Sequence, residues 1–156
     1  MRRFNCVLFF VLSLHFLTSG NSYQALAACP SLSSDNQGNS CIGSGTLSNN
    51  KGWANIAIGT AALNTNTIGG YNTTSGWFTM YSNTTGDMNT ALGYETLYLN
   101  TTGNNNTAVG GNAIGYGGKG SNNTAVGGYS GFNLTSGSNN IAPVSYTHLT
   151  LPTILL

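Results

Sequence analysis

The sequence is poor in charged residues. Asp, Glu, Lys and Arg make up 4% of the 156 residues, and the formal net charge is +1, whereas about a quarter of the residues of an ordinary soluble domain are charged. This balance argues against a basic surface for nucleic acid or an anionic membrane. Low charge also accompanies disorder, the main competing interpretation, but aliphatic and aromatic residues recur here at fixed places, which favours a regular fold.

Histidine and arginine are absent between residues 29 and 143. Acid–base catalysis needs a positioned pair of titratable groups, and Asp87 and Glu95 are the only acids close enough to be on neighbouring repeats. We expect them at different places on those repeats, so the sequence predicts no catalytic residue. A glycosidase-like carboxylate pair is the weaker alternative. The other titratable side chains of this region, cysteines and tyrosines apart, are Asp35, Lys51 and Lys119.

Metal and cofactor motifs are also missing. Zinc sites need Cys and His clusters, and "GYGGKGSNN" has a lysine where calcium-binding solenoid repeats carry an acid. The sequence therefore predicts no metal-binding and no cofactor-binding residue. Six Asn-x-Thr sequons look like by-products of a repeat built from Asn and Thr; they begin at Asn72, Asn83, Asn100, Asn105, Asn122 and Asn133.

The N-terminus has the pattern of a secretory signal peptide. Arg2 and Arg3 precede an apolar run from Cys6 to Leu17, and "ALAAC" follows, which fits a small-residue cleavage site after Ala27 or Ala28. We therefore assign residues 1–28 to a signal peptide and 29–38 to a leader of the mature chain. "LAAC" also fits a lipoprotein box with an acylated Cys29. Alternatively, Cys29 and Cys41 pair as a disulfide in an oxidising compartment, or Cys41 is a small core residue.

The central feature is an internal repeat of 17 residues over residues 39–142. Five full units follow a shorter first copy, "NSCIG" at Asn39 to Gly43. Every unit opens with Asn and has a glycine four places later and a second glycine near its end. The opening asparagines are Asn55, Asn72, Asn89, Asn106, Asn123 and Asn140; the glycines are Gly59, Gly76, Gly93, Gly110 and Gly127, then Gly69, Gly86, Gly103, Gly120 and Gly137.

Each column has a physical interpretation. The "NTAVG" segment predicts a short strand whose Ala and branched residue lie on opposite faces, and the later small–aliphatic pair, such as Ala62–Leu63, predicts a second strand. The glycines are expected at turns that need positive φ, and the asparagines are expected to stack as an amide ladder. Two strands and two turns per unit predict an all-β fold, one β-solenoid turn per repeat. Helices and propeller blades do not fit this composition and repeat length.

Such a thin solenoid is expected to self-associate. About two aliphatic side chains per unit are available for burial, which does not offset the entropy lost by ordering 17 backbone residues. We therefore expect several chains to pack about a common axis.

Units such as "NTALGYETLYLNTTGNN" resemble the head repeats of YadA-like trimeric autotransporter adhesins and of related fibre proteins with a self-cleaving chaperone domain. The resemblance implies a left-handed parallel β-roll, a homotrimer, and display at a bacterial cell surface, where such heads bind matrix proteins or surface carbohydrate. It implies a non-enzymatic adhesin head, or alternatively a segment of a phage-type tail fibre. The unit is longer here, and "NTA" stands where those repeats usually have "SxA".

Two further expectations concern single segments. The column Thr73, Thr90, Thr107 and Thr124 gives a less favoured function, an ice-binding solenoid face. Pro143 falls where an aliphatic residue is due, and Val144 to Thr153 match the translation of a transposon-based sequencing adapter. We therefore expect residues 143–156 to be an artefact that interrupts the repeats, in preference to a terminal cap.

Overall fold

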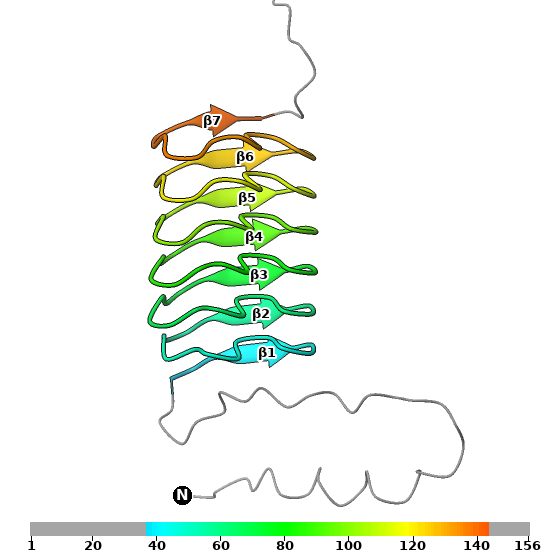
Figure 1. The fold of residues 1–156 in the computed structure, drawn as a ribbon, viewed down its shortest axis with the longest axis vertical. Helices are drawn as coiled ribbons and strands as arrows, with labels where there is room; N and C mark the ends of the chain where they lie inside the picture. Colours follow the sequence, from blue (N-terminus) through cyan, green and yellow to red (C-terminus); the bar gives the residue numbers. More distant parts are fainter. Residues whose placement is uncertain (1–36, 144–156) are drawn as a thin grey trace, which may run out of the picture.

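The computed structural model describes residues 37–143, and the expectations for the signal peptide, for Cys29 and for residues 144–156 lie outside them. Figure 1 shows the described chain as a stack of similar turns, each carrying one short strand. The predicted β-solenoid is confirmed. The strands are β1 Ser40–Ile42, β2 Ile56–Ile58, β3 Thr73–Ser75, β4 Thr90–Leu92, β5 Thr107–Val109, β6 Thr124–Val126 and β7 Ile141–Ala142.

The strands form one parallel sheet in chain order, from β1 to β7. Neighbouring strands pair in register, so Thr90 lies beside Thr107 and Ala91 beside Ala108. The first turn is one residue shorter than the others, since Ser40 pairs with Ile56. Because side chains alternate along a strand, the middle residue of each three-residue strand, β1 to β6, points inward and its two neighbours point outward, as predicted.

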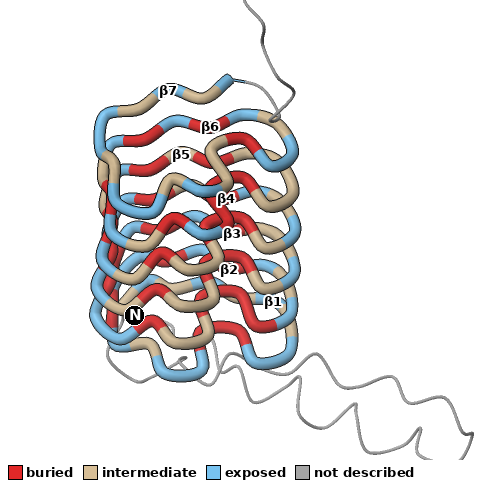
Figure 2. Tube along the Cα trace, turned by 45° about the horizontal axis from the view of Figure 1, so that its top comes forward, coloured by how far each residue is buried: buried red, intermediate tan, exposed pale blue. Residues whose placement is uncertain are grey.

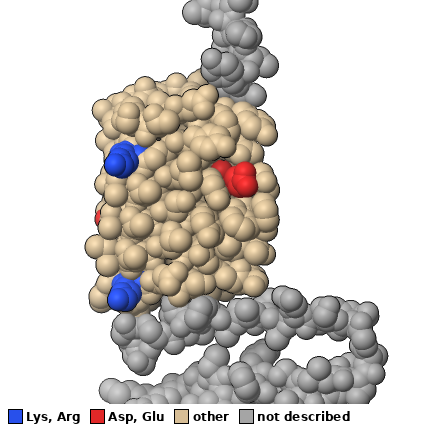
Figure 3. Space-filling view, in the orientation of Figure 1, with Lys and Arg blue, Asp and Glu red and all other residues tan. Residues whose placement is uncertain are grey.

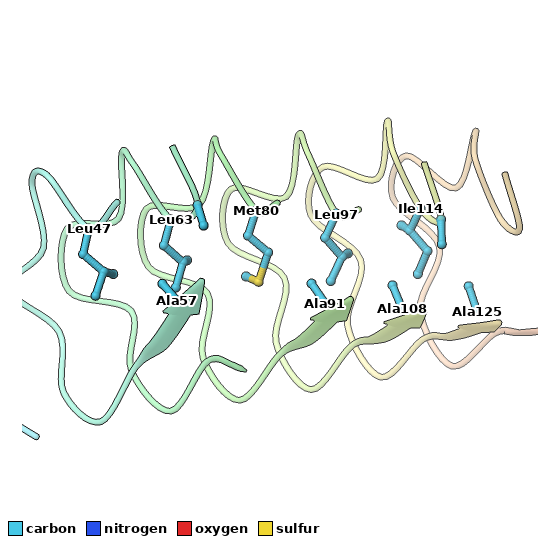
Figure 4. Close-up of a cluster of buried hydrophobic side chains, with 11 residues drawn as sticks. Leu47, Ala57, Leu63, Met80, Ala91, Leu97, Ala108, Ile114 and Ala125 are labelled. Carbon is cyan, nitrogen blue, oxygen red and sulfur yellow. The ribbon is translucent and has the colours of Figure 1, made fainter. Parts of the chain in front are cut away.

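The core is only two side chains thick. Figure 4 shows alanines of the strands facing a row of larger aliphatic residues from the opposite wall of the solenoid. In β3 the inward residue is Thr74, and its hydroxyl donates to the Ile56 carbonyl. Figure 2 shows burial recurring at the same places on successive turns. The core members are Leu47, Ala57, Ala62, Leu63, Met80, Ala91, Leu97, Ala108, Ala113, Ile114 and Ala125.

The predicted second strand is wrong. The six residues after the first glycine of each turn form a turn-like return segment, at residues 44–49, 60–65, 77–82, 94–99, 111–116 and 128–133. Ala61 and Leu63 have φ of 56° and 49°, whereas a β-strand needs φ near −120°. These left-handed residues allow two successive side chains, Ala62 and Leu63, to be buried together.

The return segments are nevertheless bonded to the turns on both sides. The Ala61 N–H donates to the Ser44 carbonyl one turn before, at 2.8 Å, and the Leu63 N–H donates to the Thr79 carbonyl one turn later, at 3.1 Å. The backbone polar groups are thus paired along the stack without a second sheet.

The two glycine columns are required for different reasons. In the first column φ lies in the left-handed region, as predicted; Gly76 has φ 146°. The second column does not have left-handed φ, so that part of the prediction is wrong. A Cβ at Gly103 would lie 2.3 Å from the Gly120 carbonyl oxygen, so close stacking of the turns excludes a side chain there.

A third left-handed column lies just before the opening asparagines. Asn105, Asn122 and Asn139 occupy it in the later turns, but Met88 occupies it at φ 57° with an exposed side chain. Asparagine tolerates this conformation better than methionine. We expect Met88→Asn to raise the free energy of unfolding by roughly 0.5–1 kcal/mol, measured by urea denaturation. Met88→Ala is the control; an equal gain in Met88→Ala would contradict the conformational explanation.

Candidate functional surfaces

Three columns of polar side chains run along the solenoid and account for much of its composition. The first is the predicted amide ladder of the opening asparagines, which is confirmed. Asn89 donates from Nδ2 to the Asn72 Oδ1 at 3.0 Å and to the Gly103 carbonyl at 2.9 Å. Its own Oδ1 accepts the Asn106 backbone N–H at 2.9 Å. Since these amides are buried, they stabilise the stack and are not available to a ligand.

Sequence reasoning missed a second ladder, formed by Asn66, Asn83 and Asn100. Asn83 donates to the Asn66 Oδ1 at 2.7 Å and Asn100 to the Asn83 Oδ1 at 2.9 Å. The signal was present, since these residues also recur every 17 positions. The ladder ends after Asn100, where the same column continues with Gly117.

The third column places side-chain oxygens over backbone N–H groups of the preceding turn. The Asp87 carboxylate accepts the Gly70 N–H at 2.6 Å, and the Asn104 side chain accepts the Asp87 N–H at 2.7 Å. Ser121 and Ser138 continue the series. Asp87 therefore has a structural role that its sequence context did not reveal.

The two carboxylates are not brought together as a pair. Asp87 contacts the Gly70 backbone, whereas Glu95 accepts a hydrogen bond from the Tyr94 hydroxyl at 3.0 Å. Figure 3 shows the two acidic groups of the described chain at opposite sides of the view. A glycosidase needs two carboxyl groups that flank the same glycosidic bond of the substrate, so this geometry does not support that alternative.

The remaining predicted residues fall in ordinary positions. Cys41 occupies the alanine column, packs against the core and is disulfide-bonded; Cys29, the partner in one of the alternatives that the sequence left open, lies outside the described residues. Within residues 37–143, no three His, Cys, Asp or Glu side chains gather as a metal site would require, and no helix is long and apolar enough to cross a bilayer.

The sequons divide into two groups. Asn72, Asn83 and Asn100 are buried in the ladders, where a glycan could not be attached without breaking the stack. Asn105, Asn122 and Asn133 are exposed.

Two surfaces remain that could contact another molecule. The first, here called the sheet face, consists of the outward side chains of the strands. The threonine column Thr73, Thr90, Thr107 and Thr124 is in register, as predicted. Ile56 and Ile141 continue this column at its two ends. The parallel column of third strand residues holds further exposed aliphatic side chains, Ile42, Ile58, Leu92 and Val126.

The second surface, here called the aromatic face, is carried by the return segments on the side of the solenoid away from the sheet. Its rings contact one another along the axis: Trp77 stacks on Tyr94 with centroids 5.2 Å apart and planes 12° apart, and Tyr81 stacks on Tyr98. The members are Trp77, Phe78, Tyr81, Tyr94, Tyr98, Tyr116, Tyr129 and Phe132.

Comparisons of this chain with protein families, curated proteins and solved structures give no match. The fold and these two surfaces are therefore the basis for a functional proposal.

Proposed function

We propose that the chain is part of the head of a secreted, trimeric, non-enzymatic surface protein of the YadA-like adhesin type. The observation that carries the proposal is the exposed sheet face. A solenoid whose core is two side chains thick leaves its most regular apolar surface uncovered, and contiguous apolar patches of this kind mark interaction sites.

The residues of the sheet face suit contact with other copies of the chain. Ile58 and Leu92 are 42% and 38% exposed, because they are the outward-pointing third residues of their strands and nothing in the described part of the chain covers them. All charged side chains of the described residues, Lys51, Asp87, Glu95 and Lys119, lie outside the strands, so no charge has to be desolvated when the face is covered. Burial of the aliphatic column in an oligomer would add roughly 25 cal/mol for each Å² of apolar surface removed from water.

Three-fold symmetry is the arrangement that the resemblance implies. Three solenoids with their sheet faces toward one axis would bring each column beside its own copies, turn by turn. A cyclic oligomer of this kind closes on itself and leaves the sheet face covered in every copy. The aromatic face, on the opposite side of each solenoid, would then point away from the axis.

The trimer can be tested by a substitution that introduces one charged side chain per chain on the sheet face. Leu92→Glu would place three carboxylates near the axis, so we expect it to dissociate the oligomer. The parent chain is expected to show three times the mass of one chain in light scattering, and the variant the mass of one. Ile68→Glu is the control, because Ile68 is 64% exposed but lies outside the strands. A parent chain that is monomeric, or a control that dissociates equally, would count against the proposal.

The threonine column keeps an ice-binding face as a second candidate. Thr73, Thr90, Thr107 and Thr124 form a regular outward row. The Thr-Thr pairs Thr84–Thr85 and Thr101–Thr102 lie outside the strands, and the hydroxyl groups of Thr84 and Thr101 donate hydrogen bonds to backbone carbonyls. These pairs therefore do not add a second threonine row to the sheet face. Thermal hysteresis of the purified chain would favour this candidate, whereas a trimer without hysteresis would favour the adhesin head.

A further inference from the structure

The aromatic face is interrupted at Gly111 and Gly128, two successive positions of one column that carry no side chain. These two positions are here called the step. Trp77 and Tyr94 occupy the same position in successive turns, and that position continues with Gly111 and Gly128. Trp77 covers one face of the Tyr94 ring. The next two residues of the column are glycines, so no side chain of that column covers the other face.

The space beside these two glycines is open, so their lack of a side chain is not required by packing. A Cβ at Gly111 would have its nearest neighbour, the Tyr94 carbonyl oxygen, 3.9 Å away, and one at Gly128 would lie 3.8 Å from the Gly111 oxygen. Neither glycine has left-handed φ. Stability therefore does not demand glycine at either position, in contrast to the two glycine columns of the repeat.

Aromatic rings border the two glycines at one end and at one side. Tyr94 lies one turn before Gly111 in the same column, whereas Tyr129 follows Gly128 in the neighbouring column of Glu95 and Asn112. Tyr129 is two turns after Tyr94, which corresponds to roughly 10 Å along the axis at the usual strand spacing. Tyr129 and Tyr116 are each held against Phe132, at centroid distances of 5.3 Å and 4.6 Å. Because these rings are already packed, little side-chain entropy would be lost when a ligand binds.

The polar side chains around these two glycines are an amide and a carboxylate, and both can accept hydrogen bonds from a ligand. Asn112 follows Gly111, and Glu95 is the one ionisable carboxylate of the described return segments. The Tyr94 hydroxyl donates to Glu95 Oε1, and this hydrogen bond, with smaller contributions from desolvation and neighbouring groups, raises the pKa of Tyr94. A tyrosine phenol is protonated at neutral pH in any case, and the second Glu95 oxygen can accept a hydrogen bond from a ligand hydroxyl group.

We propose that the step between Tyr94 and Tyr129 binds a sugar ring of a neutral polysaccharide. A pyranose has apolar C–H faces that pack on aromatic rings and hydroxyls at its edge that bond to amides and carboxylates. The aromatic face continues from the turn of Trp77 to that of Phe132, three turns or roughly 14 Å, which would accommodate neighbouring sugars. This inference rests on the proposed adhesin function, for which it names the class of partner.

Three neutral hexasaccharides serve as probes: cellohexaose, chitohexaose and linear mannohexaose. The chain contains two tryptophans, and Trp53→Phe leaves Trp77 as the single fluorescent reporter beside Tyr94. We expect at least one probe to change the Trp77 emission with a dissociation constant in the micromolar to millimolar range. In this background, Tyr94→Ala is expected to weaken binding by roughly tenfold or more.

Gly111→Tyr is the sharper variant. Its new ring would extend the Trp77–Tyr94 stack and fill the step, so we expect an unchanged or higher melting temperature together with loss of binding. Tyr71→Ala is the control, since Tyr71 is exposed but lies outside the return segments. No binding of any probe at millimolar concentration, or equal binding by the parent and both variants, would overturn the inference.

The mass of the parent chain separates this inference from the proposed function. A trimer that binds no probe would retain the proposed function and reject the sugar site. A monomer that binds a probe, and loses it in Gly111→Tyr, would retain the site and reject the trimeric head.

Discussion

Replacing Gly76 by alanine is expected to destabilise the solenoid by more than about 4 kcal/mol. Two costs act together at this position. The residue has φ 146°, which L-residues with a side chain rarely adopt, and the new Cβ would lie 2.2 Å from the Gly93 carbonyl oxygen and 2.6 Å from the Thr79 Oγ1. Backbone atoms of the next turn cannot move aside without breaking the sheet register.

Two further glycine variants separate these costs. Gly120→Ala tests the steric cost alone, because its φ is not left-handed but its Cβ would lie 2.1 Å from the Gly137 oxygen. Gly111→Ala is the matched control and should leave stability within about 0.5 kcal/mol of the parent. Urea denaturation followed by circular dichroism measures all three. A Gly76→Ala chain as stable as Gly111→Ala would show that the turns are not stacked as described.

The second large effect concerns the buried amide ladder. Asn89→Leu keeps a similar volume but leaves the Asn106 N–H without its acceptor and removes the bonds to Asn72 and Gly103. One buried donor without a partner and two lost bonds together cost roughly 3–5 kcal/mol. Asn133→Leu, at an exposed asparagine, should change the free energy of unfolding by less than about 0.5 kcal/mol.

Asn89→Asp tests the direction of the hydrogen bond. The substitution keeps an oxygen for the Asn106 N–H but places a second oxygen against the Asn72 Oδ1 and the Gly103 carbonyl. Burial would raise the folded-state pKa of this carboxyl above its unfolded value of about 3.9. The variant should therefore lose stability as the pH rises above about 4, relative to the parent chain. Stability independent of pH would contradict a buried, donating amide at position 89.

The sheet, the first glycine column and the amide ladder were predictable because each depends on local chemistry repeated at a fixed interval. Alternation of Ala91 with Thr90 and Leu92 determines which side chain is buried, and a residue that needs positive φ is usually glycine. Asn at one place in every turn can bond to its own copies without any long-range information.

The return segments were not predictable in the same way. Leu63, Met80 and Leu97 have left-handed φ, which their side chains disfavour by roughly 1–2 kcal/mol. The tertiary structure overrides this preference, since the same conformation buries each aliphatic side chain opposite the alanine column (Figure 4). The sequence carries the small–aliphatic pair, but a strand is the conformation that propensity favours for it.

The open step of the aromatic face could not be predicted from the sequence, because it requires the surroundings of each glycine to be known. Gly93 and Gly111 are both glycines of the repeat region, yet a Cβ would clash at the first and meet open space at the second. The sequence distinguishes them only by their columns, because position 93 is glycine in every turn and position 111 is aromatic in two turns. The structure therefore separates glycines needed for stacking from those that leave room for a ligand.

We propose that copies of the chain meet through the sheet face. This contact can be tested by introducing one cysteine per chain, because Cys41 is already disulfide-bonded. Thr107→Cys lies in the middle of the threonine column, and Tyr116→Cys lies on the aromatic face. Each variant is oxidised at low concentration, and the products are separated by non-reducing electrophoresis. We expect covalent dimers, two linked chains of each three, for Thr107→Cys and none for Tyr116→Cys. Cross-linking through Tyr116→Cys alone, or none in either variant, would show that the chains do not meet through the sheet face.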